Sequence, residues 1–231
     1  MLSGNDAANV FVHVYIMRKF AASLFLVASL IAVNAGATVI TSIPGGTVIP
    51  MPAINYFGPG PQMFGPGVTW SSTNASNQGG SVFGYAGGYG FLNNGFWDGA
   101  LGPMAGVNDS TDYYGVTDTM TFAFATPVSA VGGFLNYVPG GSTPTTIAVW
   151  NSGGGLIESY NLAFTTDGST DSGAFYGFQE SGAIISYFTL TDNYVGITNL
   201  TTSAVPEPGS LLLLGSGLLG TVGVIRRKIN L

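Results

Sequence analysis

Two short runs of acidic and hydroxylated residues are the parts of this chain best suited to binding chemistry. Residues 108–112 read NDSTD and residues 167–173 read DGSTDSG. Calcium takes roughly six to eight oxygen ligands, and short polar loops supply several of them. We expect no cofactor, with calcium as the exception that these runs suggest. An ordinary solvated turn is the alternative at each run. The candidate metal ligands are Asp109, Asp112, Asp167 and Asp171.

Aromatic residues in a glycine-rich segment form a second set of candidates. Residues 79–99 interleave Gly with Phe, Tyr and Trp, and Asn93, Asn94 and Asp98 lie among them. Aromatic faces stack on sugar rings, while a few polar groups orient the ligand. Carbohydrate binding is therefore one interpretation, and the alternative is that the rings fill the core of a chain poor in Leu and Ile. The candidate sugar-stacking residues are Trp70, Tyr89 and Trp97.

Missing residue types exclude several classes of active site. His13 is the only histidine, and the chain has no cysteine. The basic residues are Arg18, Lys19, Arg226, Arg227 and Lys228. Residues 20–225 therefore cannot form a Ser-His-Asp or Cys-His site, a histidine or thiolate zinc site, or a lysine base. A glycosidase needs only two carboxylates and stays as a distant third interpretation, so we expect no enzyme.

The segment between the basic clusters is strongly acidic. Residues 38–203 hold nine of the eleven acidic residues, because only Asp6 and Glu207 lie outside them, and they hold no Lys, Arg or His. Such a surface repels nucleic acid and anionic lipid head groups. The length suits one domain with a substantial core, and without disulfides this core must supply the stability.

Alternating apolar and polar residues predict short strands from about residue 117 onward. Gly132-Gly133 is expected to form a bulge in the second of these strands, and Gly153-Gly154-Gly155 a hairpin turn. The predicted fold is all-β, an antiparallel β-sandwich over 68–203, with a β-barrel as the alternative. Residues 38–67, rich in Pro and Gly, are expected to form an extended lead-in. The predicted strands are 119–124, 128–138, 145–150, 156–164, 174–178, 184–190 and 194–200.

The N-terminus has the pattern of a secretory signal peptide over 17–37. Met17-Arg18-Lys19 precedes an apolar stretch over 20–33, and Ala35 and Ala37 supply the small residues of a cleavage site. This pattern predicts a signal helix and export by the secretion machinery. Because a signal peptide begins near its positive charges, we expect translation to start at Met17 and residues 1–16 to be an upstream extension.

The C-terminus has the pattern of a membrane anchor. An uncharged stretch over 209–225 follows a proline-flanked acidic residue, and it falls near the lower end of the roughly 17–25 residues of a spanning helix. A basic stop of Arg226, Arg227 and Lys228 follows the stretch. By the positive-inside rule this end is cytoplasmic and the preceding domain lies outside. The motif before the stretch is Val205, Pro206, Glu207 and Pro208.

These tail features together resemble the PEP-CTERM sorting signal over 204–231. The resemblance implies a substrate of an exosortase that recognises Val205 to Pro208. It further implies an inner-membrane anchored precursor in an exopolysaccharide-producing Gram-negative bacterium, and later a place at the cell surface or in the extracellular matrix.

The domain itself looks like the jelly-roll passengers of PEP-CTERM proteins, some of which are similar to carbohydrate-binding modules. The likeness rests on the phrase FATPVSAVGGF over 124–134 and on FYGF over 175–178. Such passengers often close on an Ile-Asp-Asn-Leu strand. This chain has Ile-Thr-Asn-Leu over 197–200, and the threonine weakens any inherited metal or ligand role there.

The sequence thus predicts an exported surface or matrix protein with a structural or adhesive role in the exopolysaccharide layer. Its expected partners are the exosortase, the secretion machinery and extracellular polysaccharide, with membrane contact through the C-terminal helix before processing. A calcium-assisted carbohydrate-binding module is the alternative function.

Overall fold

The computed structural model describes residues 38–51, 55–73, 80–83, 88–108, 117–140 and 143–203, which all belong to one compact unit, Ala37–Leu231. The predicted signal peptide over 17–37, the predicted start at Met17 and the predicted sorting signal over 204–231 lie outside the described residues. Within the described ranges, no helix is both long enough and apolar enough to span a bilayer.

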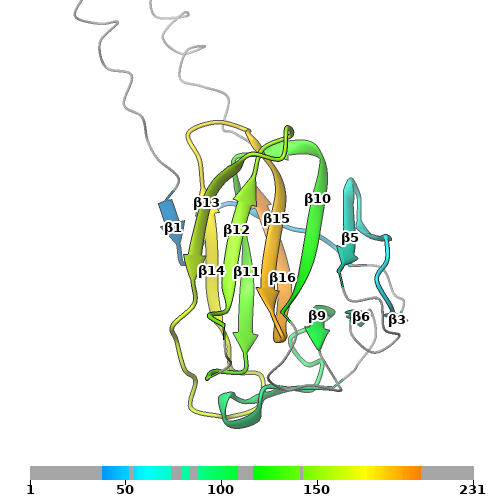
Figure 1. Cartoon of the computed structure of the whole chain (residues 1–231), viewed down its shortest axis with the longest axis vertical. Coiled ribbons are helices and arrows are strands. Elements are labelled where there is room, and N and C mark those ends of the chain that lie inside the picture. The colour runs from blue at the N-terminus through cyan, green and yellow to red at the C-terminus, as the bar shows by residue number, and fades with distance from the viewer. Residues whose placement is uncertain are drawn as a thin grey trace, which may run out of the picture. The chain divides into compact units, whose positions relative to one another are not determined.

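Two antiparallel sheets make up the domain (Figure 1). The first has eight strands, in which β2 (Thr47–Val48) pairs with β16 beside the main order. That order is β1 (Thr38–Ile40), β14 (Ala174–Gln179), β11 (Ala130–Tyr137), β16 (Tyr194–Ser203), β9 (Met104–Asn108), β6 (Gly80–Phe83) and β3 (Asn55–Phe57). The second sheet runs β13 (Leu156–Asn161), β12 (Thr146–Trp150), β15 (Ile185–Asp192), β10 (Asp118–Val128), β5 (Val68–Ser72) and β4 (Gln62–Gly65).

A small hairpin stands beside the sheets. β7 (Tyr89–Gly90) and β8 (Phe96–Trp97) pair antiparallel, and a single 3-10 turn, Leu92–Asn94, connects them. Its rings form a second apolar cluster in which Phe91 and Trp97 are both fully buried. Their ring centroids lie 5.0 Å apart in an edge-to-face arrangement, so the hairpin is anchored by aromatic packing.

Strict alternation explains why the central strands form where they do. On β10, Met120 and Phe122 are buried, and their cross-strand partners on β15 are Leu190 and Phe188. Threonines alternate with these apolar residues on both strands and face away from the core; Thr119 Oγ1 lies 2.8 Å from Thr191 Oγ1. A period of two thus gives each strand one apolar face and one hydroxylated face.

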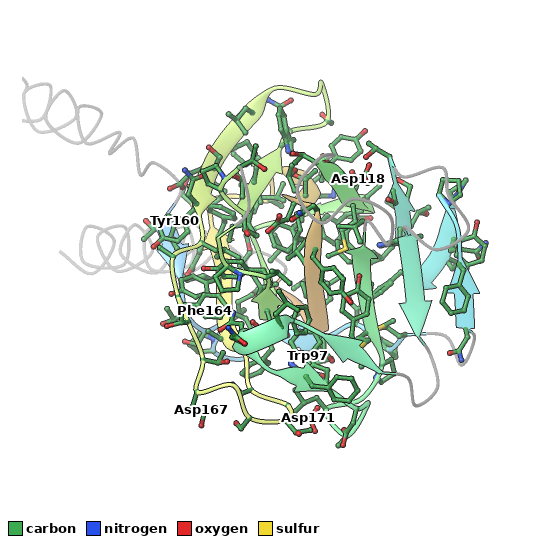
Figure 2. All side chains as sticks on the ribbon, turned by 60° about the horizontal axis from the view of Figure 1, so that its bottom comes forward. Trp97, Asp118, Tyr160, Phe164, Asp167 and Asp171 are labelled. Carbon is green, nitrogen blue, oxygen red and sulfur yellow. The ribbon has the colours of Figure 1, made fainter. Side chains whose placement is uncertain are left out.

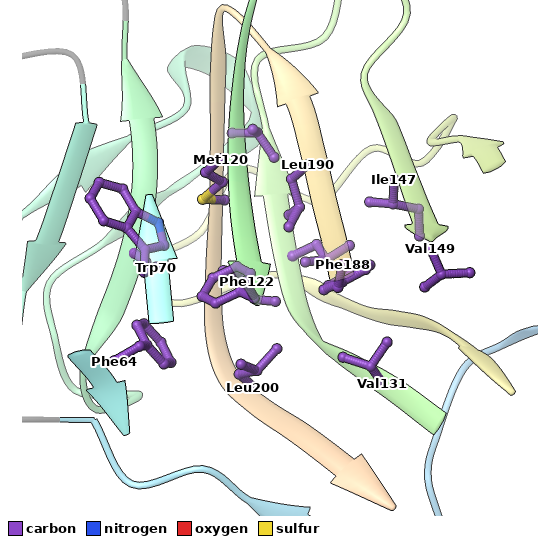
Figure 3. Close-up of a cluster of buried hydrophobic side chains, with 14 of the residues drawn as sticks. Phe64, Trp70, Met120, Phe122, Val131, Ile147, Val149, Phe188, Leu190 and Leu200 are labelled. Carbon is purple, nitrogen blue, oxygen red and sulfur yellow. The ribbon is translucent and has the colours of Figure 1, made fainter. Parts of the chain in front are cut away.

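Both sheets contribute their apolar faces to one core (Figure 3). Phe178 of β14 packs edge-to-face on Phe188 of β15 with centroids 6.4 Å apart, which joins the first sheet to the second. Fully burying a side chain of this size contributes about 1.5–3 kcal/mol. Two sheets with separate strand orders around a shared core form a sandwich, which confirms the all-β prediction.

The predicted strands from residue 117 onward are all present, and so is the predicted bulge. The pairing of β11 with β16 shifts register between Gly132 and Phe134. On its other side, β11 approaches β14 so closely that a Cβ on Gly177 would lie 2.2 Å from the carbonyl oxygen of Val131. Glycine is therefore required at position 177, where the two paired strands lie closest.

The segment expected to be a lead-in is instead part of both sheets. β1 pairs with β14, β2 with β16, and β4 with β5. The expectation of an extended lead-in over 38–67 was wrong because very short edge strands pair through backbone groups and need no apolar alternation. Proline and glycine are tolerated at such edges.

Candidate functional site

A surface pocket of about 420 Å³ lies beside the loop that precedes β14. It is lined by apolar side chains at one side and by the loop's polar residues at the other. Among the lining residues are Leu101, Phe134, Phe164, Asp167, Asp171 and Asn199. Figure 2 shows Phe164, Asp167 and Asp171 around this end of the domain. The structure places Asp167 and Asp171, two of the predicted calcium ligands, in the lining of this pocket.

A buried amide network holds the loop in place. Asn136 Nδ2 donates to the carbonyl oxygens of Asn94 at 2.6 Å and Ser172 at 2.9 Å. Asn94 Nδ2 donates to Asn136 Oδ1 at 2.7 Å, and Asn94 Oδ1 accepts from the Thr166 N–H at 2.6 Å. Because Asn94 and Asn136 are almost fully buried, these bonds are shielded from water and fix the loop against β11.

Strand β8 of the hairpin also bonds to this loop. Trp97 Nε1 donates to the Ser172 carbonyl oxygen at 3.1 Å, and the Asp171 N–H donates to the Phe96 carbonyl oxygen at 2.7 Å. Phe96 and Thr170 also form an isolated parallel bridge. The loop is therefore held by hydrogen bonds at 166 and at 170–172, which leaves its acidic side chains on a fixed backbone.

The loop carboxylates differ in their surroundings. Asp167 Oδ1 accepts from Ser169 Oγ at 2.6 Å and from the Ser169 N–H at 3.0 Å, and these bonds lower the pKa of Asp167. Desolvation raises the pKa of Asp171, and the nearby Asp98 carboxylate raises it further. The Asp98 N–H donates to Asp171 Oδ1 at 3.2 Å, and this bond lowers the pKa.

Asp98 is therefore a third carboxylate at this end of the domain, and the predicted metal ligands did not include it. Its own Oδ1 accepts from the Ala100 N–H at 2.8 Å. Its place next to Asp171 depends on the hairpin docking against the loop, so no local pattern in the sequence marks the pair.

Calcium binding at the loop stays a prediction. Asp167 and Asp171 line one pocket, but across the described ranges no three His, Cys, Asp or Glu side chains cluster in a way that could hold a metal ion. Asp109 and Asp112 lie outside the described residues. Any ion at the loop would therefore need hydroxyl, carbonyl or water oxygens in addition to the two carboxylates.

The predicted sugar-stacking residues lie in the core. Trp70 and Trp97 are 0% exposed and Tyr89 is 4% exposed. Trp70 packs edge-to-face on Tyr56 with centroids 6.3 Å apart, and Tyr89 lies 5.0 Å from Tyr194. A buried ring offers no face to a sugar, so the structure corrects this expectation: the rings fill the core, where the chain has few Leu and Ile.

Other aromatic rings reach the surface in their place. Phe134 is 42% exposed, lines the pocket and meets Phe175 edge-to-face at 5.6 Å. Phe164 stacks on Tyr176 at 5.4 Å, and Tyr160 stacks on the same ring at 5.9 Å. These rings come from three separate segments, and the sequence analysis did not single them out as candidates.

Asp192 is a buried acid with a structural role. It is 1% exposed, and its carboxylate accepts from Thr145 Oγ1 and from the Asn193 N–H at 2.6 Å. Burial raises the pKa of Asp192, while these hydrogen bonds oppose the rise. Its two bonds tie β15 to the segment before β12 and to the turn before β16, which accounts for a carboxylate in this position.

The fold and this site define an acidic β-sandwich domain without basic side chains, with a polar and aromatic pocket at one end. The family model of the PEP-CTERM protein-sorting motif matches residues 204–228, directly after this domain. The chain therefore carries a PEP-CTERM signal and is an exosortase-sorted extracellular protein, made as an exported and membrane-anchored precursor. No curated protein and no solved structure matches the chain.

Proposed function

We propose that this protein is a non-enzymatic structural or adhesive component of the exopolysaccharide layer of a Gram-negative bacterium. The observation that carries the proposal is the sorting motif at 204–228 behind a domain that has no Lys, Arg, His or Cys. The motif supports delivery to the cell surface, and the missing residue types favour binding or structure over catalysis.

The same sequence features support the expected route. A signal peptide over 17–37 would deliver the domain across the inner membrane, and the anchor at 209–225 would hold it until an exosortase acts at Val205 to Pro208. The experiment replaces Pro206 and Pro208 by Ala in the producing strain. The unprocessed precursor should accumulate in the inner membrane fraction, and wild-type levels of processed protein in the matrix would contradict the proposal.

Deletion of the gene tests the adhesive role. The layer should lose cohesion, measured as the shear stress that detaches a biofilm, and the wild-type chain supplied in trans should restore it. Restoration by the Pro206→Ala, Pro208→Ala chain to the same level would show that sorting is not needed for the role. An unchanged detachment stress after deletion would overturn the role itself.

Carbohydrate binding is the second candidate function, and one observation favours it. The pocket beside the loop combines an exposed ring, Phe134, with the carboxylates of Asp167 and Asp171. Sugar sites combine an apolar platform with a few oriented polar groups. Phe134 would supply the stacking face, and calcium at the loop would assist by binding to sugar hydroxyls.

A matched pair of variants tests the carbohydrate proposal. Phe134→Ala should weaken retention of the protein on its own strain's polysaccharide by about tenfold, since a stacked ring contributes on the order of 1 kcal/mol or more. Phe57→Ala is the control, because Phe57 is 50% exposed on β3 and lies at the far edge of the same sheet. Equal retention of both variants would contradict a sugar site at the pocket.

A further inference from the structure

Glu158 and Glu180 lie opposite each other where the two sheets meet at an edge. Val149 of β12 is the cross-strand partner of both Glu158 and Phe188. Phe178 packs on that same Phe188 from the first sheet, and Glu180 follows Phe178 by two residues, which gives it the same facing along an extended chain. The two glutamates therefore approach each other from β13 and from the end of β14.

One oxygen of each carboxylate is buried without a hydrogen-bond partner. Glu180 is only 7% exposed, and its Oε1 is buried and unpaired; the same holds for Oε2 of the half-buried Glu158. The Glu180 backbone is fixed, since its N–H donates to the Ser129 carbonyl oxygen at 2.7 Å. An ionised carboxylate in such a position loses hydration that nothing on the protein replaces.

A third unpaired oxygen belongs to the strand that follows. Ser186 is 5% exposed, and its Oγ is buried without a partner. Burial alternates along β15 from Ser186 through Phe188 to Leu190, so Ser186 points to the inner side of its sheet. Ser186 lies two residues before Phe188 on β15. Glu180 lies two residues after Phe178, at the end of β14. The two residues therefore flank the short connection from β14 to β15.

The charge of this pair has no compensation in the domain. Residues 38–203 contain no Lys, Arg or His, so no side-chain cation can approach. Desolvation raises the pKa of both glutamates, and the negative charge of Glu158 raises that of Glu180 further. Buried charges in proteins are paired with an opposite charge, coordinate a metal or are neutralised by a proton. Residues 38–203 supply no opposite charge, so a cation from solution would compete with protons for this pair.

We propose that Glu158 and Glu180 bind a divalent cation of the calcium type, with Ser186 Oγ as a further oxygen ligand. The ligand atoms are all hard oxygens, which calcium prefers. The site offers none of the nitrogen and sulfur ligands that zinc prefers. Calcium also accepts irregular geometry with water in the remaining positions, whereas magnesium demands a near-ideal octahedron. The ion would join the edge strand β13 to β14 across the sandwich, apart from the loop at 167–173.

Terbium luminescence tests the site on the purified full-length chain in detergent micelles. Terbium replaces calcium, and the nearby rings of Tyr160 and Tyr176 would sensitise its emission. Wild-type protein should bind terbium saturably with this sensitised emission, and calcium should displace it. Glu158→Gln and Glu180→Gln should each weaken binding by about tenfold or more, because each removes a charged ligand.

Asp171→Asn is the matched control, since it removes a carboxylate from the other candidate loop. It should leave the emission sensitised by Tyr160 and Tyr176 unchanged. Saturable binding that persists in both glutamine variants, or the lack of any saturable binding by the wild-type protein, would overturn the proposal. Loss of the signal in Asp171→Asn alone would place the ion at the loop and also overturn it.

Thermal unfolding separates loss of the ion from loss of the fold. With chelator present, the glutamine variants should be at least as stable as the wild-type protein, because each removes a buried like charge. Added calcium should raise the Tm of the wild-type protein and of Asp171→Asn by more than it raises that of the glutamine variants. A calcium-dependent rise of equal size in all four proteins would contradict a site at Glu158 and Glu180.

Discussion

At the scale of single residues, the buried amide of Asn136 controls the loop that forms the pocket. It donates to two carbonyl oxygens, and its Oδ1 accepts from Asn94 Nδ2 at 2.7 Å and from the Tyr137 N–H at 2.8 Å. These bonds connect β11, the hairpin and the loop at one point. The positions of Asp167 and Asp171 thus depend on a side chain that contacts neither carboxylate.

Replacing this residue by alanine should therefore be costly. Asn136→Ala leaves several buried donors and acceptors unpaired, and we expect a loss of about 2–4 kcal/mol in the free energy of unfolding, measured by urea denaturation. The control is Asn161→Ala, since Asn161 is exposed on the edge strand β13; it should change stability by about 0.5 kcal/mol or less. Similar losses in both variants would contradict this role of the network.

At the scale of elements, the pairing of β11 with β14 leaves no room for a side chain at Gly177. A Cβ on Gly177 would lie 2.2 Å from the Val131 carbonyl oxygen and 2.6 Å from the Gly132 Cα. Both neighbours are backbone atoms of a central strand and cannot move independently. The register of the two strands therefore depends on the absence of a side chain at Gly177.

Gly177→Ala should destabilise the domain by about 1–3 kcal/mol, the usual cost of overpacking a close contact. Gly182→Ala is the matched control, since nothing lies within 4 Å of a Cβ there, and it should be nearly neutral. The Tm of the two variants, measured side by side, checks the prediction. A Gly177→Ala protein as stable as the wild type would show that β11 and β14 can separate without cost.

Elements with a strong local pattern could be predicted from the sequence, and elements held by distant partners could not. β10 was found because Met120 and Phe122 alternate with threonines. β1 was missed because a three-residue edge strand pairs through its backbone to β14, far along the chain.

The candidate site was predicted less well than the fold. A ring such as Trp97 has the same sequence context in a core as on a surface, so its burial followed only from the docked hairpin. Glu158 and Glu180 lie on different sheets, and their encounter depends on the whole sandwich. Asp167 and Asp171 line one pocket because both belong to one loop, and their predicted role as calcium ligands stays a prediction.

At the scale of the whole molecule, no basic side chain compensates the negative charge of the domain. This predicts an unusual pH dependence of its free energy of unfolding. Burial raises the pKa values of Glu158, Glu180 and Asp192, and desolvation together with Asp98 raises that of Asp171. Among the carboxyls with a shifted pKa in the described ranges, Asp167 is the one whose pKa is lowered. Native carboxyls with raised pKa values bind protons more tightly than unfolded ones, so their contribution to stability grows as pH falls toward those values.

The free energy of unfolding should therefore increase from pH 7 to about pH 5, above the ordinary range of Asp and Glu near pH 4. Asp167 acts in the opposite direction, since its contribution is lost as the pH falls, but only below that ordinary range. Urea denaturation in chelator at several pH values measures the slope. Glu180→Gln should show a smaller increase, and a stability that falls steadily from pH 7 to pH 5 would contradict the prediction.

The place of β16 in the first sheet has a mechanical consequence. β16 ends at Ser203, directly before the sorting motif, and it is hydrogen-bonded to β11 on one side and to β9 and β2 on the other. Tension on a tethered precursor would load this central strand along its length. The bonds on both sides would then resist in parallel by shear, whereas an edge strand would peel away one bond at a time.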